Sequence, residues 1–103
     1  MSTSNGSVFK VVFSEFVQVE IRNLFGRAKQ VGQAHAFLSA LKKIVARLRS
    51  DLDRFGETRF ALANLKLEVR VGSERPLLVV YGVNKVTRVV FVRDVLGLPG
   101  AGF

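Results

Sequence analysis

The chain has 103 residues, of which 49% are hydrophobic, so it can form one domain with a single core and is not disordered by composition. It contains no cysteine, which excludes disulfides, thiol catalysis and cysteine metal sites. Sixteen Lys and Arg against eight Asp and Glu give a net charge of +8, which favours a polyanion or an acidic protein as partner.

The N-terminal residues carry no targeting signal. Residues 1–7 lack the basic start and apolar middle of a signal peptide, so we expect a disordered N-terminus on a cytoplasmic protein. Residues 8–13 alternate as a first strand that is apolar on nearly both faces. The longest apolar run, residues 77–83, is too short to cross a bilayer, so we expect no membrane association.

Two helices follow the first strand. Ser14 is suited to cap a helix, and apolar residues then recur at helical spacing from Val17 to Ala28. Gly32 marks a break before a second helix, which begins near residue 34. One apolar face of that helix runs from Phe37 to Phe55. Gly56 follows as the predicted helix stop, because glycine tolerates a positive φ.

The apolar period changes from helical to alternating near residue 60. Residues 65–71 read as a strand with one buried face, and residues 72–76 form a turn. Residues 77–83 are apolar throughout, which predicts a central strand covered on both sides. The last strand spans residues 86–95. We expect the helical hairpin to lie across the strand face made by Leu65, Leu67, Val69 and Val71.

The predicted fold class is α+β, in the order βααβββ. A helical hairpin packs on a mainly antiparallel four-stranded sheet, and residues 8–96 form this single domain. Residues 97–103 are expected to be a flexible C-terminal tail.

Three segments of the second half carry a family resemblance. They are "LKLEVRVG" at 65–72, "LLVVYGV" at 77–83 and "TRVVFVRDV" at 87–95, preceded by the linking segment "DLDRFGETRFAL" at 51–62. Together with the element order, the length and the charge, they resemble the RelE/ParE superfamily of toxin–antitoxin systems. The resemblance covers residues 8–95. In that superfamily, RelE-like members cut mRNA on the ribosome with a basic cluster on the sheet, and ParE-like members poison DNA gyrase.

The resemblance implies candidate site residues. Lys66 and Arg70 match two basic positions of the cutting members, whereas Glu68 and Leu78 stand where those members carry further cations. The segment after the last strand, "LGLPGAGF", is uncharged where they carry a basic cluster and a tyrosine. The catalytic candidates are therefore Lys66, Arg70 and Tyr81, for a metal-independent endoribonuclease. Whether the chain is an enzyme stays open. The candidates for nucleic-acid or target binding are Lys66, Arg70, Arg75, Arg88 and Arg93.

Other polar residues have structural interpretations. His35 is the single histidine and has no neighbouring ligand pattern, so we expect a capping or surface role, no metal and no cofactor. The cations of the second helix are expected to form a solvated face that could extend a phosphate-binding surface. They are Lys42, Lys43, Arg47 and Arg49.

The sequence therefore predicts a toxin-like component of a type II toxin–antitoxin module. Its partner would be an acidic antitoxin that folds over exposed apolar positions at the helical hairpin and the sheet edge. Its target would be the ribosome and mRNA, or DNA gyrase. The alternative is a non-toxic basic module that binds RNA or protein and has lost the nuclease chemistry.

Overall fold

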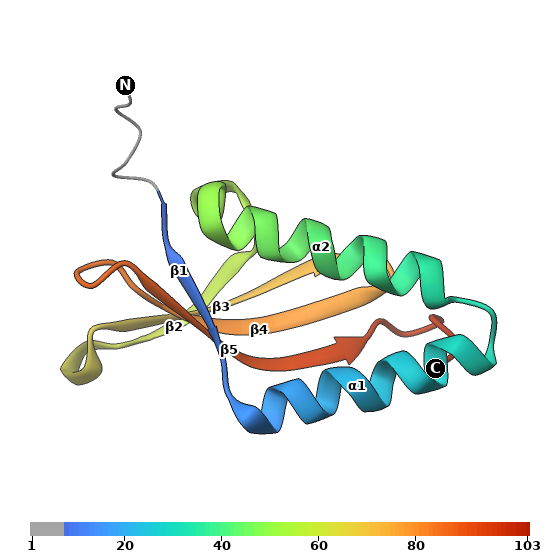
Figure 1. The fold of residues 1–103 in the computed structure, drawn as a ribbon. Coiled ribbons are helices and arrows are strands. Elements are labelled where there is room, and N and C mark those ends of the chain that lie inside the picture. The colour runs from blue at the N-terminus through green and yellow to red at the C-terminus, as the bar shows by residue number, and fades with distance from the viewer. Residues whose placement is uncertain (1–7) are drawn as a thin grey trace.

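The computed structural model describes residues 8–103, so the expectation of disorder at residues 1–7 lies outside the described residues. The fold is α+β, with two helices packed on a five-stranded mixed sheet (Figure 1). In chain order the elements are β1 (Lys10–Phe13), α1 (Glu15–Gln30), α2 (Ala34–Ser50), β2 (Glu57–Leu62), β3 (Leu67–Glu74), β4 (Leu77–Asn84) and β5 (Val89–Gly97). Two short 3₁₀ helices, Leu52–Arg54 and Ala63–Leu65, flank β2.

The sheet has the strand order β1-β5-β4-β3-β2, which confirms the 77–83 segment as the central strand. β1 pairs with β5 in parallel, and the other three pairings are antiparallel. The expectation of four strands was wrong, because the linking segment contains the edge strand β2. A bulge at Arg59 interrupts its alternation, and its side chains are almost all exposed, which weakens the strand signal.

The helix boundaries follow local chemistry. The hydroxyl of Ser14 accepts a hydrogen bond from the Val17 amide at 3.2 Å, which confirms the predicted N-cap of α1. Gly32, at φ +74°, lies in the turn between the helices. α2 ends at Ser50, earlier than predicted, because the chain tightens into a 3₁₀ turn. Gly56 adopts φ +76° after that turn, where a Cβ would meet the Tyr81 hydroxyl at 2.5 Å.

The helices cover one face of the sheet. The β4 side chains on that face are fully buried in the core and are Leu77, Val79, Tyr81 and Val83. Their directly opposite partners on β3 are Glu74, Gly72, Arg70 and Glu68. The prediction that the hairpin covers Leu65, Leu67, Val69 and Val71 was therefore wrong. The last three lie on the opposite side of the sheet, and Leu65 lies exposed in a 3₁₀ helix.

The side of the sheet away from the helices is called the open face from here on. The prediction that residues 77–83 are covered on both sides was wrong for the described residues, because no helix lies over this side (Figure 1). Its central apolar side chains are Val69, Val71, Leu78, Val80, Phe91 and Leu96.

The C-terminal segment packs on the core and does not extend away as the expected flexible tail. Ala101 is buried, and its carbonyl oxygen accepts a hydrogen bond from the Gln33 amide group at 2.6 Å. The ring of Phe103 packs edge-on against Phe37, with 6.0 Å between ring centroids. These contacts close the end of the hairpin near Gly32. No helix among residues 8–103 has the length and apolarity needed to span a membrane.

Candidate functional site

Arg70 forms the centre of a polar network on the helix side of β3. Its guanidinium group contacts Glu68 at 2.8 Å and the Thr58 hydroxyl at 3.0 Å. It also donates to the carbonyl oxygens of Phe55 and Gly56, at 3.3 Å and 3.1 Å. The Thr58 hydroxyl donates to Glu68 in turn. Because every one of these partners lies on β2, on β3 or in the segment before β2, Arg70 fastens the chain that leaves α2 to the sheet.

Tyr81 belongs to the same structural corner. Its side chain is fully buried, its hydroxyl donates to the Phe55 carbonyl oxygen at 2.7 Å, and its ring stacks on the Phe55 ring. Burial raises the pKa of the Tyr81 hydroxyl, since the charged phenolate is disfavoured away from water. The hydrogen bond from Thr58 is the main cause that lowers the pKa of Glu68, with Arg70 adding to it. The network thus keeps Glu68 ionised and Tyr81 neutral.

The structure does not bring the predicted site residues together. Arg75 lies in the turn after β3, and Arg88 lies in the turn before β5, at the opposite end of the sheet. Lys66 precedes β3 in a left-handed conformation, about 13 Å along the strand from Arg70. Arg93 is the extra residue of a bulge in β5. Of the three catalytic candidates, only Arg70 and Tyr81 lie in one corner, where both serve packing and hydrogen bonding.

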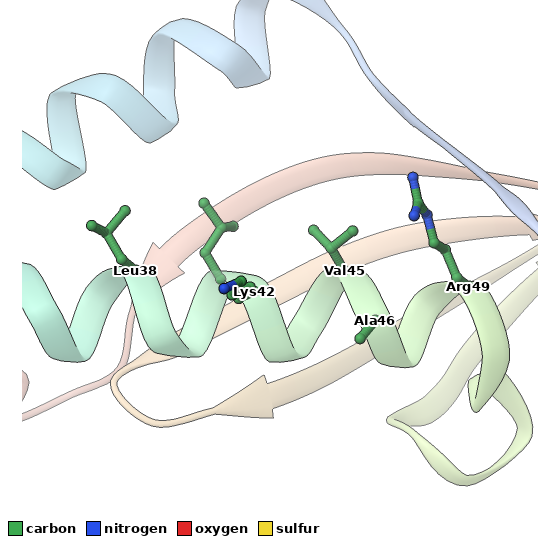
Figure 2. Close-up of a pocket in the computed structure, with 6 residues that line it drawn as sticks. Leu38, Lys42, Val45, Ala46 and Arg49 are labelled. Atoms are coloured by element: carbon green, nitrogen blue, oxygen red, sulfur yellow. The ribbon is translucent and has the colours of Figure 1, made fainter.

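A second feature is a groove of about 660 Å³ beside α2, on the side that faces α1. The two helices meet near their connecting turn, where the rings of Phe25 and Phe37 lie 5.5 Å apart, and they diverge away from it (Figure 1). Figure 2 shows Leu38, Val45 and Arg49 projecting from the same side of α2. The inter-helix groove is lined by Leu38, Leu41, Lys42, Val45, Ala46 and Arg49.

The rims of the inter-helix groove are basic. Lys42 and Arg49 are exposed on α2, and no acidic side chain contributes to the lining. On α1, the ammonium group of Lys29 lies 5.5 Å from the centre of the Phe25 ring, which places this cation on the flank that faces α2. Arg22 precedes Phe25 by three residues and shares that flank by helical spacing. The groove therefore combines an apolar lining with two cations of α2, and Arg22 and Lys29 lie on the flank of α1 that faces it.

The expectation for Lys42 and Arg49 was a solvated helix face that could extend a phosphate-binding surface. Leu38, Leu41 and Val45 belong to the apolar face predicted for this helix, and in the structure they extend its buried stripe sideways toward Lys42 and Arg49. Arg47 was expected on the same solvated face, but its guanidinium group forms ion pairs with Asp51 at 3.3 Å and Glu74 at 3.7 Å. In the part of the chain that the structure describes, no group of three or more His, Asp or Glu side chains could hold a metal ion.

Comparison with models of known protein families, with curated proteins and with solved structures finds no match to this chain. The likeness to RelE/ParE toxins over residues 8–95 stays a prediction from the sequence pattern.

Proposed function

We propose that this protein is the toxin-like component of a toxin–antitoxin module and that its inter-helix groove binds an acidic, amphipathic helix of the antitoxin. The observation that carries the proposal is the groove beside α2, whose apolar lining is flanked by Lys42 and Arg49. A helix laid in a groove of this kind buries apolar residues spaced three and four apart. Its flanking carboxylates would face Lys42 and Arg49 on one side and Arg22 and Lys29 on the other.

Charge and apolar contact have separate effects in this binding mode. The net charge of +8 accelerates the encounter with an acidic chain, and this effect weakens as salt increases. Burial of Leu38, which is 51% exposed in the free protein, adds affinity that salt does not screen. We therefore expect a complex that weakens in salt but persists.

The network around Arg70 favours a binding role over RNA cleavage. Arg70 is bonded to Glu68, to Thr58 and to two backbone carbonyls, and the Tyr81 hydroxyl is buried against the Phe55 carbonyl. Neither group is available to contact a phosphate or move a proton without breaking these bonds. Inhibition of a target by binding is therefore the form of toxicity that we propose.

The test begins with the gene beside the one that encodes this chain, which should encode a small acidic protein, and proceeds by co-expression of the two. We expect the chain alone to slow growth, and the acidic protein to relieve the effect and to co-elute with it in gel filtration. Leu38→Asp and Arg49→Glu should each weaken the complex at least about tenfold, because one places a charge on the apolar floor and the other reverses a rim charge. Lys43→Glu is the matched control, since Lys43 is exposed on α2 but does not line the groove.

Two outcomes separate the parts of the proposal. If the groove variants bind the acidic protein as tightly as the Lys43→Glu control, the groove is not the binding site. If the groove variants lose binding but the chain is harmless when expressed alone, the alternative of a non-toxic protein-binding module replaces the toxin.

A further inference from the structure

The central strand β4 has the sequence of a strand buried on both faces. Leu77, Val79 and Tyr81 are buried under the helices, whereas Leu78 and Val80 point to the open face and are only half-buried. An antiparallel sheet with one solvated face normally places polar residues on that face. β4 instead carries apolar residues there, so its composition indicates a second layer packed on the open face. Residues 8–103 do not supply that layer.

Apolar residues of the open face run in register across all five strands, although Val69 at the centre is already buried. The strand pairings align Val12, Phe91, Gly82, Val69 and Phe60 in one row from β1 to β2. Phe60, Phe91 and Leu96 keep 50%, 42% and 45% of their surface exposed. Exposed large apolar side chains that form one contiguous patch mark an interaction surface.

The open face is close to neutral, unlike the rest of the molecule. By strand pairing it carries Lys10 from β1, Glu57 from β2 and Asp94 from β5. Each of the exposed bulge residues Arg59 and Arg93 lies, together with an open-face neighbour, between residues that face the helices, so they add two cations to the open face, whose formal charge is then about +1. A surface with so little net charge does not attract a polyanion or an acidic chain, whereas the basic inter-helix groove does. It does allow a second identical surface to approach, since each copy offers both cations and carboxylates to the other.

The dimensions suit a pair of chains. Five strands span about 24 Å and average seven residues, or about 23 Å, so the flat footprint is about 550 Å². This area lies below the ~800 Å² that each partner buries in a standard interface, at the low end of specific interfaces, which suits a reversible dimer. Two sheets packed face to face in this way form a common architecture, with their side chains interdigitating.

We propose that two copies of this chain dimerise through their open faces, as a two-fold symmetric sandwich of sheets. The pairing buries Phe60, Phe91 and Leu96 of both copies and completes the second cover of β4. It leaves the inter-helix groove on the outer surface of each copy, so the dimer and the proposed antitoxin contact use separate surfaces.

The test is sedimentation equilibrium of the full chain from about 1 µM to about 1 mM, a range that separates weak from stable association. We expect a reversible monomer–dimer equilibrium. Phe91→Lys and, separately, Leu96→Lys should raise the dimer dissociation constant at least about tenfold, because each places like charges opposite one another in the apolar contact. The matched control is Phe16→Lys, since Phe16 is exposed on α1, away from the open face. Far-UV circular dichroism checks that each variant keeps its fold.

The salt dependence of association distinguishes the possible partners of the open face. Two chains of charge +8 repel one another, so added salt should strengthen the dimer, whereas salt weakens binding of RNA or of an acidic protein. A chain that stays monomeric at about 1 mM would overturn the proposal. So would a dimer that is unaffected by both lysine variants, or loss of antitoxin binding in Phe91→Lys, which would assign the open face to that partner. Leu38→Asp should leave the dimer intact, so failure of the groove and failure of the dimer are separate results.

Discussion

Replacing Arg70 with methionine should destabilise the fold by about 2–3 kcal/mol. The substitution keeps the aliphatic volume and removes all the hydrogen-bond donors. The lost contacts are the ion pair to Glu68 and the bonds to Thr58, Phe55 and Gly56. A hydrogen bond to a charged group contributes about 1.5–3 kcal/mol, and breaking a fully buried ion pair costs about 3–5 kcal/mol.

The estimate lies within the range for a charged hydrogen bond and below the cost of breaking a fully buried pair, because the pair is unevenly buried. The side chain of Arg70 is 11% exposed and that of Glu68 is 26% exposed, so water can partly solvate the abandoned carboxylate. Glu68 also keeps its hydrogen bond from Thr58, and the Phe55 carbonyl keeps its bond from Tyr81. The Gly56 carbonyl loses the bond that Arg70 supplied.

The assay is urea unfolding at pH 7, followed by far-UV circular dichroism, of the wild type, Arg70→Met and the control Arg75→Met. Arg75 is exposed in the turn between β3 and β4, and a surface substitution of this kind changes stability by about 0.5 kcal/mol or less. If Arg70→Met is as stable as Arg75→Met, Arg70 does not fasten the segment after α2. Arg70 would then be a cation available for binding, as the sequence predicted.

Two further predictions concern the same corner. Gly72→Ala should destabilise by about 1–3 kcal/mol in urea unfolding, because a Cβ would meet the buried Phe55 ring at 2.6 Å, whereas Gly26→Ala in α1, with nothing within 4 Å, should be neutral or stabilising. Glu68 has a lowered pKa in the folded state, so its contribution is complete above its ordinary value of 4.5 and is lost as the pH falls through the folded pKa. The stability difference between wild type and Glu68→Gln should therefore shrink in acid, and a difference that is constant between about pH 3 and 7 would contradict this account.

Local features of the fold could be predicted from the sequence because their causes lie within a few residues. The cap at Ser14 depends on a hydroxyl three residues before an amide, and the break at Gly32 depends on a positive φ that glycine adopts without strain. The apolar period indicated helices in the first half and strands in the second, and the uniformly apolar run of β4 indicated the centre of the sheet.

The candidate site depended on contacts between distant residues. The alternation in β3 shows that its two faces differ. Because β4 is apolar on both faces, its sequence does not indicate which face the helices cover. The helices cover the side where Gly72 leaves room for the Phe55 ring and where Arg70 reaches carbonyls fourteen and fifteen residues earlier. The inter-helix groove likewise exists only because α1 and α2 diverge. Sequence therefore determined the two helices and four of the five strands, but not the exposed edge strand β2. Packing decided which charges were buried in hydrogen bonds and which stayed exposed, because burial of a cation depends on partners that the chain supplies only after folding.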